Sequence, residues 1–449
     1  MSDRTLNTMQ VGSMLVSTSC GIGFLLGTGE LALRQGMAGC LYAVATALGL
    51  MMLAVCAPAL WHRRQSIWSQ FQQLYGPSVG RNVALLSLIW MTGVLAAQIR
   101  GGSSVLALTG LPRPTAVFLI VIFLVVLSLI RLSWLSAGFA VCLLTCNLVL
   151  VHSLAATGNA SLWLRAPVSF AKAIQHCSPA QTGFVLLSVA TMVVFGADYQ
   201  QFAIAARKPS AAKAGCLLAA ALVFAIGFLP ACAVIAASAT GSLKDVADPV
   251  QTVPVLLMNS LPGRSTHAAR SLVTIVLVTT ALGSASSILR AMSDAVATLG
   301  PPSNMQPVWS RLVPVLLGTL IASRPQSLVD MMVDLNVVYI AAIGPLLVLN
   351  ALRVHVSDGA ANAAIATACA ISMGGYLLRW TCSISLPVAV PLIVSMPAAL
   401  AAAVWYRPRT AIPSGKFRRR PSINQMPLQP RAHPTAEPRS GYAGEADGD

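Results

Sequence analysis

Residues 17–30, STSCGIGFLLGTGE, place glycines inside the first apolar stretch of the chain, which is long enough to cross a membrane. Because hydrocarbon offers the backbone no hydrogen-bond partner, a spanning helix normally keeps its backbone groups bonded within itself. Glycine weakens such a helix, and an open backbone is tolerated in a membrane where its freed carbonyls and amides line a cavity. The alternative is that the glycines only allow two helices to pack closely. They are Gly21, Gly23, Gly27 and Gly29.

The rest of the chain has the composition of an integral membrane protein. Of its 449 residues, 56% are hydrophobic and 9% are charged, whereas soluble domains carry about 25% charged residues. The net charge of +16 comes from single Lys and Arg residues near the ends of apolar runs and from one basic tail. This distribution indicates membrane topology and excludes a nucleic-acid partner. The ten cysteines lie mostly in apolar runs without ligands at metal-binding spacing, so no metal other than a coupling cation is expected.

Recurring apolar runs predict an all-α polytopic membrane protein with about twelve transmembrane helices. Lys and Arg gather in alternate loops and after the last run, which puts both termini in the cytoplasm and the protein in the cytoplasmic (inner) membrane. The spans are expected near residues 10–33, 38–60, 82–108, 115–131, 135–157, 180–206, 213–240, 268–297, 308–324, 327–352, 362–380 and 385–405.

Three local features lie near the expected membrane surfaces. Residues 66–81 carry apolar side chains at helical spacing, which predicts a short amphipathic helix on the inner surface. Residues 243–262 form the longest polar outer loop and could serve as a lid. Near the outer end of the first span, Glu30 and Arg34 are four residues apart, which is the spacing of a local ion pair.

A second interruption falls in the sixth span, at residues 195–198, FGAD. The first and sixth spans correspond if the first five helices are repeated, in inverted orientation, by the next five. Two interrupted helices at matching positions of two halves indicate a transport site near the middle of the membrane. This pairing favours an open backbone at the first glycines over close packing alone.

Several spaced motifs support the same organisation. They are GTGELALRQGMAGCLYAVATALGL at residues 27–50, FQQLYG at 71–76, QQFAIAARKPSAAKAG at 200–215, and DPVQTVPVLLMNSLPG at 248–263 leading into ALGSASSILRAMSDA at 281–295. In order and spacing they resemble the sodium:solute symporter family, which has the leucine-transporter fold and belongs to the amino acid–polyamine–organocation superfamily. Family members usually carry an additional helix before the broken one, and Phe202 stands where they have an arginine.

The resemblance covers about residues 10–350 and implies a five-plus-five inverted repeat with broken helices 1 and 6. Residues 1–9 are then a cytoplasmic amino-terminus, 10–352 the ten-helix transporter core, 353–406 two additional helices, and 407–449 a basic cytoplasmic tail, whose Pro-, Arg- and Ser-rich composition is typical of disorder. The implied function is cation-coupled symport of a small organic solute by alternating access. The expected partners are that solute and the lipid bilayer, with no cofactor besides the coupling ion.

The resemblance also implies a sodium site. In the family it uses backbone carbonyls of the broken first helix and carbonyl and hydroxyl oxygens of the eighth, and a hard cation requires such oxygen ligands. Gly283 stands where the family commonly has a second hydroxyl. The coupling ion is therefore expected to be sodium, or a proton if the missing hydroxyl disables the site. The implied positions are Ser17, Cys20, Thr280, Gly283 and Ser284.

Residues at the two interruptions, together with polar and aromatic residues in the spans, are candidates to line the solute path. An ionisable group in the middle of a membrane costs at least ~2.5 kcal/mol on insertion scales, so such groups tend to be paired or functional. Asp198 is the first candidate for a proton-coupled carboxylate, and Arg100 is a candidate to contact a solute carboxylate. Any of the others can instead serve packing: Gly21, Gly23, Trp90, Gln98, Phe195 and Tyr199.

Other functional classes remain open. One is an ion-independent carrier or exporter, and another is a sensor that keeps the transporter fold and signals to a partner. A sensor is expected to carry a cytoplasmic signalling domain, and residues 407–449 are too few and too polar to fold alone. An enzyme is disfavoured because the six histidines lie mostly in loops or near span ends, without a serine or carboxylate partner in the pattern. The sequence does not indicate the solute or the oligomeric state.

Overall fold

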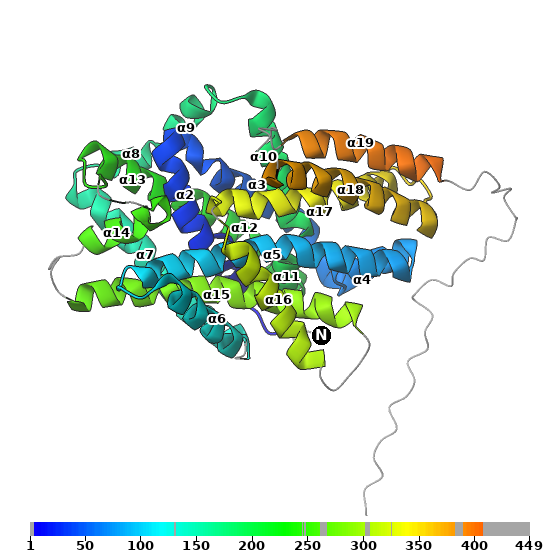
Figure 1. Ribbon diagram of the computed structural model, residues 1–449, viewed down its shortest axis with the longest axis horizontal. Coiled ribbons are helices and arrows are strands. Elements are labelled where there is room, and N and C mark those ends of the chain that lie inside the picture. The colour runs from blue at the N-terminus through cyan, green and yellow to red at the C-terminus, as the bar shows by residue number, and fades with distance from the viewer. Residues whose placement is uncertain are drawn as a thin grey trace, which may run out of the picture. The chain divides into compact units, whose positions relative to one another are not determined.

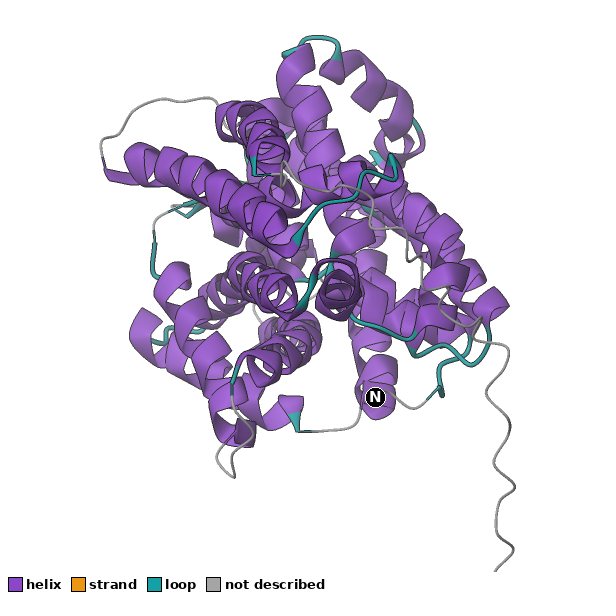
Figure 2. Ribbon diagram, turned by 90° about the vertical axis from the view of Figure 1, so that its right-hand side faces the viewer, coloured by secondary structure: helices purple, strands orange, loops and turns teal. Residues whose placement is uncertain are grey.

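The computed structural model describes residues 4–129, 132–244, 246, 248–260, 267–300, 306–324, 326–381 and 389–406. The described residues form one compact unit. The tail predicted at residues 407–449 lies outside the described residues. Within the described part of the chain the regular structure is helical, apart from an isolated bridge between Leu6 and Ala206, and Figure 2 shows helices joined by loops. The all-α prediction is confirmed.

The α-helices, in chain order, are α1 (Thr8–Ser19), α2 (Ile22–Gln35), α3 (Leu41–Arg63), α4 (Ile67–Tyr75), α5 (Pro77–Ala107), α6 (Arg113–Ser128), α7 (Leu132–Ala156), α8 (Ala160–Leu164), α9 (Ala166–Ile174), α10 (Pro179–Phe195), α11 (Ala197–Ile204), α12 (Pro209–Ile226), α13 (Leu229–Ala239), α14 (Thr252–Ser260), α15 (His267–Leu299), α16 (Gln306–Ala322), α17 (Leu328–Ala351), α18 (Asp358–Thr381) and α19 (Ala389–Trp405). Two short 3-10 helices, η1 (Gly36–Cys40) and η2 (Pro249–Gln251), connect longer elements. Each predicted span overlaps one α-helix or two consecutive ones.

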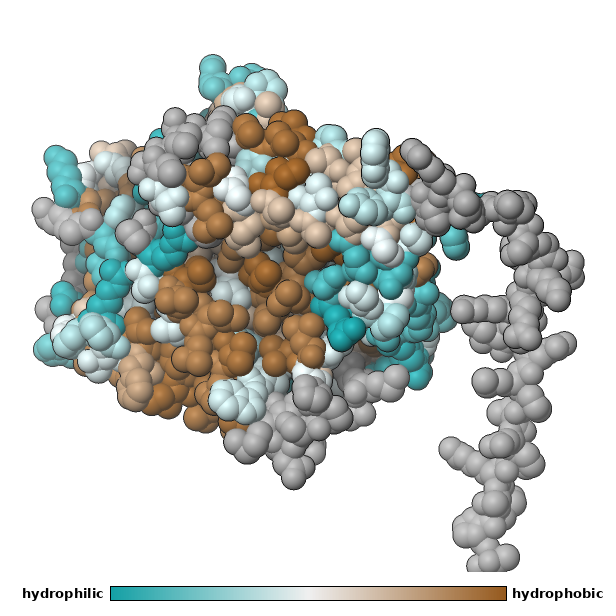
Figure 3. All heavy atoms as spheres, turned by 45° about the vertical axis from the view of Figure 1, so that its right-hand side comes forward, coloured by the Kyte–Doolittle hydropathy of each residue, from teal (hydrophilic) through white to brown (hydrophobic). Residues whose placement is uncertain are grey.

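Many of these helices can cross a membrane. Among the described residues, six helical runs are long and apolar enough, and α10 with α11 makes a seventh that bends by 43°. Phe118 of α6 and Leu316 and Leu320 of α16 are 62%, 65% and 67% exposed. Figure 3 shows such apolar side chains as a broad surface with polar residues at its two ends. An apolar surface of this extent fits contact with lipid, so the chain is a multi-pass membrane protein.

The packing of the helices repeats between two halves of the chain. α1 packs on α12 as α10 packs on α3, and α2 packs on α13 as α11 packs on α3. Likewise α5 contacts α16 and α17, whereas α15 contacts α6 and α7. Exchanging the elements of α1–α7 with those of α10–α17 therefore reproduces the contacts. Because each half holds five spans, an odd number, the halves run in opposite directions, which is the predicted five-plus-five inverted repeat.

The helices run side by side along one direction, which is horizontal in Figure 1. The helix α4 lies toward one end of the bundle, where Arg4 borders the same cleft as Ser66 and Trp68, and α8 and α14 lie toward the other end (Figure 1). These ends are named here the amino-terminal side and the far side. The helix predicted within residues 66–81 is α4, whose Ser66 accepts a hydrogen bond from the Ser69 amide. Its apolar residues Ile67, Trp68 and Phe71 are buried in the protein.

Candidate functional site

The first helix break lies between α1 and α2. Cys20 leaves the helical conformation (φ −99°, ψ 29°) and Gly21 is extended at ψ 174° before α2 begins at Ile22. The Cys20 amide still donates to the Val16 carbonyl at 2.7 Å, so α1 is intact up to this point. The break predicted within residues 17–30 is confirmed, and it occupies Cys20 and Gly21.

Side chains from α5 and α15 approach the first break closely. A Cβ atom on Gly21 would lie 2.5 Å from Ser284 Oγ and 3.0 Å from Gln98 Nε2. Gln98 also accepts a hydrogen bond from the Gly23 amide, at 3.1 Å between Oε1 and N. Gly21 is thus required by the close approach of its neighbours, and it stands where the backbone opens. Gly21 therefore both opens the backbone and allows close helix packing.

Hydroxyl groups of α15 lie against the carbonyl end of α1. Ser284 Oγ donates to the Thr18 carbonyl at 3.4 Å, and the Thr18 and Ser287 hydroxyls are 3.2 Å apart. Thr280 Oγ1 donates within its own helix to Val276, and the Gly283 carbonyl accepts from Ser286. Of the sodium-site residues expected on α15, Ser284 therefore contacts the break directly.

The second break lies at Gly196, between α10 and α11, where ψ is 125°. Two carbonyls at the end of α10 are bonded by side chains instead of helix amides. Gln200 Nε2 donates to the Val194 carbonyl at 2.8 Å, and the Tyr339 hydroxyl of α17 donates to the Phe195 carbonyl at 3.0 Å. The predicted interruption of the sixth span is confirmed.

Asp198 lies in the first turn of α11, beside this break. It is 1% exposed, and its Oδ1 has no hydrogen-bond partner among the described residues. A Cβ atom on Gly196 would lie 2.6 Å from Asp198 Oδ1 and 3.1 Å from Trp90 Cζ2, so both side chains adjoin the same glycine. The positive end of α11 favours a carboxylate at this position.

Several aromatic rings lie near the Asp198 carboxylate. The centroids of Trp90 and Tyr339 are 6.0 Å apart with tilted planes. The phenol groups of Tyr42, Tyr199 and Tyr339 are close enough to interact electrostatically with Asp198. Of the predicted solute-path residues, the structure thus brings Trp90, Asp198 and Tyr199 together at the second break, with Phe195 contributing its carbonyl.

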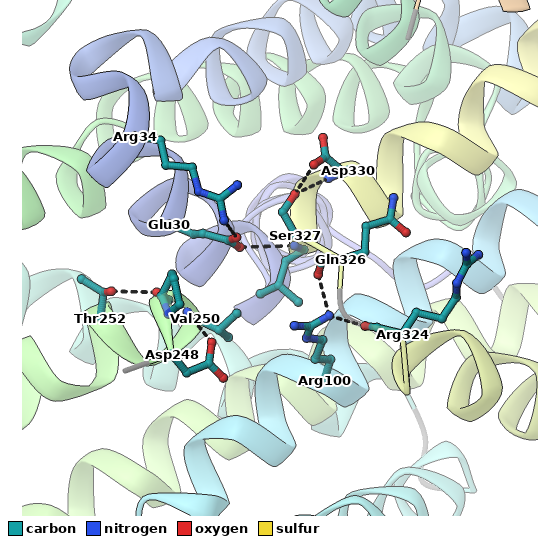
Figure 4. A network of polar contacts seen from close by, with 12 residues as sticks. Glu30, Arg34, Arg100, Asp248, Val250, Thr252, Arg324, Gln326, Ser327 and Asp330 are labelled. Atoms are coloured by element: carbon teal, nitrogen blue, oxygen red, sulfur yellow. Dashed lines mark hydrogen bonds and ion pairs between the residues drawn. The ribbon is translucent and has the colours of Figure 1, made fainter. Parts of the chain in front are cut away.

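Arg100 does not lie at either break. Its guanidinium donates to the backbone carbonyls of Arg324 and Gln326, just before α17 (Figure 4). In the same region Glu30 pairs with Arg34 at 3.0 Å and accepts from the Leu328 amide at 3.4 Å. We name this network the far-side clasp, because it links α2 and α5 to the start of α17. The Glu30–Arg34 pair predicted from their spacing is confirmed.

An amino-terminal strap closes part of the opposite side. The Leu6 amide donates to the Ala205 carbonyl at 3.2 Å, and the Arg207 amide donates to the Leu6 carbonyl at 2.9 Å. The Arg4 guanidinium lies 3.3 Å from the ring centroid of Trp61 and donates to its carbonyl. The strap therefore holds the start of α1 against the end of α11.

Two clefts approach the Asp198 region from opposite sides. A cleft of about 250 Å³ on the amino-terminal side is bordered by Arg4, Trp68, Ala197 and Gln200. A cleft of about 290 Å³ on the far side is bordered by residues that include Tyr42. Ala197, the residue before Asp198, borders the amino-terminal cleft, and Tyr42, which interacts electrostatically with Asp198, borders the far-side cleft. Asp198 itself borders neither cleft.

Solved structures share this architecture. A Na⁺-coupled sialic acid symporter in a substrate-bound outward-open state matches with a TM-score of 0.71 and 12% identity, over 90% of each chain. The chain has the leucine-transporter fold. Mhp1, a nucleobase-cation-symport-1 family transporter, matches with a TM-score of 0.60 and 13% identity over 90% of this chain and 93% of its own. A manganese transporter of Eremococcus coleocola matches at 0.55 and 14% over 88% and 86%.

These likenesses show the fold alone. No protein-family model and no curated protein matches the chain. The sodium:solute symporter family in particular therefore stays a prediction from the motifs, and so do the roles of individual residues.

Several residues at the breaks were not predicted from the sequence. Ser287 follows Ser284 by three residues on α15, so helical spacing alone could have indicated that it faces the same neighbour. Tyr339 and Tyr42 are hydroxyl-bearing residues inside apolar spans, which is a weaker signal. Gln200 belongs to the motif at residues 200–215 and was not predicted as a site residue, yet its side chain donates a hydrogen bond to the Val194 carbonyl at the end of α10.

Proposed function

We propose that this protein is a secondary transporter that moves a small organic solute across the membrane by alternating access. The observation that carries the proposal is the position of Asp198 and Trp90, both buried beside a helix break, with two clefts that each reach a neighbour of Asp198. Half-helices that end near the middle of a membrane supply backbone groups for binding ions and solutes. The fold shared with secondary transporters supports the same conclusion.

The coupling ion is proposed to be sodium, bound between α1 and α15. The carbonyl end of α1 carries a partial negative charge, and oxygen atoms are the ligands a hard cation prefers. The proposed ligands come from Ser17, Cys20, Thr280, Gly283 and Ser284, with the Thr18 and Ser287 hydroxyls beside them. A proton carried by Asp198 is the alternative, and it is favoured by the buried carboxylate with an unbonded oxygen within the described structure.

The amino-terminal side is proposed to face the cytoplasm. Arg4, Arg64 and Arg207 lie on this side, and positive residues favour the cytoplasmic ends of spans. Labelling of single cysteines in intact cells, at Ser66 on this side and at Thr157 on the other, tests the assignment. Labelling of the Ser66→Cys variant from outside the cell would contradict it.

Binding of solutes to the purified protein tests the proposed function. Thermal melting is measured across a library of amines, amino acids, organic acids and nucleobases, in sodium, in potassium and at two pH values. A solute that binds the folded state raises the melting temperature by mass action. A hit is then followed in liposomes as exchange of labelled for unlabelled solute. Absence of both stabilisation and exchange under every condition would contradict the proposal.

A further inference from the structure

The Asp198 carboxylate lacks a counter-charge. It is 1% exposed, and no Lys or Arg side chain in the described part of the chain pairs with it. An ionised carboxylate buried without a partner is strongly unfavourable. The group therefore needs either a proton or a cation that arrives with the ion or the solute.

Acceptor groups of the protein itself lie at both places where this fold could receive an anionic solute group. Anionic groups bind at the positive amino-terminal ends of half-helices in such transporters. At α2, the Gly23 amide donates to Gln98 Oε1 at 3.1 Å. At α11, the first turn holds the Asp198 carboxylate itself. Both positive ends thus meet an acceptor that belongs to the protein.

Arg4 and Arg64 border the amino-terminal cleft together with Asp294, and two other cationic side chains are held away from both breaks. Arg100 is held by the carbonyls of Arg324 and Gln326, and Arg34 is paired with Glu30 in the far-side clasp (Figure 4). The ionisable group beside the second break is therefore an acid, which is negative whenever it is not protonated. A solute carboxylate placed there would be repelled by Asp198.

The rings beside Asp198 complete a site for a cation. Trp90 and Asp198 both adjoin Gly196, and the Trp90 ring lies 6.0 Å from that of Tyr339. The face of an indole or phenol ring attracts a cation. Indole is the strongest of these rings, and Trp90 is fully buried. A carboxylate with such rings nearby matches an ammonium group in charge and offers it an aromatic contact.

We propose that the solute is an organic cation whose ammonium group pairs with Asp198 and contacts the ring of Trp90. This inference rests on the proposed transport function and names the solute class of the same site. It excludes organic acids as substrates. In this proposal the Asp198 carboxylate recognises the solute, and the coupling cation binds between α1 and α15.

Matched compounds test the charge preference directly. The purified full-length protein is melted with 2-phenylethylamine, 2-phenylethanol and 3-phenylpropanoate, and with the corresponding series built on a butyl group. These sets keep the apolar part and vary the charge. The amines are expected to raise the melting temperature, the alcohols to act at least tenfold more weakly by concentration, and the carboxylates to have no effect. Equal effects of the amine and alcohol members, or stabilisation by the carboxylates, would overturn the inference.

Variants then locate the recognition. Asp198→Asn is expected to weaken amine binding at least tenfold, and Trp90→Leu to weaken it by a smaller factor. Asp358→Asn, which removes a carboxylate at the start of α18, is the matched control and should bind amines as the parent does. Unchanged amine binding in Asp198→Asn would overturn the inference. If that variant does not fold, the compound series on the parent protein and on Trp90→Leu decides the matter.

The outcomes separate the inference from the proposed function. Binding and exchange of neutral or anionic solutes would overturn the organic-cation inference while supporting transport. Stabilisation by sodium that disappears in Asp198→Asn, without any amine binding, would assign the carboxylate to the coupling ion and overturn the inference. Failure of every compound to bind or exchange would contradict the transport function, and the inference would fall with it.

Discussion

The two helix breaks occupy equivalent places in the two halves of the chain but hold different chemistry. At Gly21 the neighbours are the Gln98 amide and the Ser284 hydroxyl, each hydrogen-bonded to the broken helix. At Gly196 the neighbours are the Asp198 carboxylate and the Trp90 indole. A break therefore sets where a site can form, because it frees backbone groups. The side chains around it, on the broken helix itself and on the helices packed against it, decide what binds, which here means oxygen ligands at one break and an acid with rings at the other.

The largest expected effect comes from filling the space at the second break. In Gly196→Ala the new Cβ would lie 2.6 Å from Asp198 Oδ1 and 2.8 Å from the Met192 carbonyl. Because one of these atoms belongs to the backbone, relief requires movement of α10, and we expect a loss of about 2–4 kcal/mol of stability. Gly21→Ala meets side-chain atoms of Ser284 and Gln98 and should lose less. Thermal melting measures both.

Gly183, on α10, supplies the control for the Gly196→Ala and Gly21→Ala variants. A Cβ on Gly183 of α10 would have nothing within 4 Å, so Gly183→Ala should keep or slightly raise the melting temperature. The comparison of the two breaks would fail if Gly196→Ala melted like Gly183→Ala. The predicted ranking of the two breaks would be wrong if Gly21→Ala lowered the melting temperature more than Gly196→Ala.

A smaller effect is expected from removing a hydroxyl at the first break. Ser284→Ala deletes the group that donates to the Thr18 carbonyl and one proposed sodium ligand. We expect the sodium concentration needed for half-maximal stabilisation to rise about tenfold, which is about 1.4 kcal/mol. The amine preference should persist at saturating sodium, since Asp198 lies at the other break. The measurement is melting against sodium concentration, with potassium chloride keeping ionic strength constant.

Ser293→Ala is the matched control, because that hydroxyl bonds the Leu289 carbonyl within α15, away from the proposed ligands. Its sodium dependence should stay near that of the parent protein. A Ser284→Ala protein with unaltered sodium dependence would remove sodium from the first break. A parent protein that responds to pH and not to sodium would move the coupling to Asp198.

Features of the breaks that depend on residues close in the sequence could be predicted, whereas features that depend on residues distant in the sequence could not. The two interruptions were visible because glycine inside an apolar run is a local signal, and both were confirmed. The partners that bond the freed backbone, such as Tyr339 and Gln98, come from helices far away in sequence, and apolar patterning carries no information about which face meets a break. Arg100 illustrates the same limit. Its role depends on the carbonyls before α17, which no spacing within α5 reveals.

The smallest expected effect lies away from both breaks, in the far-side clasp. Glu30 is 3% exposed, but its partner Arg34 has a side chain that is 57% exposed, so solvent screens the ion pair. Glu30→Gln removes that pair and keeps an acceptor oxygen for the Leu328 amide, so a loss of about 0.5–1 kcal/mol is expected. Glu30→Ala removes both contacts and should lose slightly more. Thermal melting measures the loss of stability, and hydrogen exchange shows whether the first turn of α17 is the part that opens more readily.

The clasp variants sharpen the comparison because they alter polar contacts without touching either break. If recognition belongs to the breaks, Glu30→Gln keeps the parent's preference for amines over alcohols and its sodium dependence, while α17 exchanges faster at its start. A changed preference would mean that the far side takes part in choosing the solute. The two breaks would then no longer account for selectivity by themselves, and the side chains that border the far-side cleft would have to share that role.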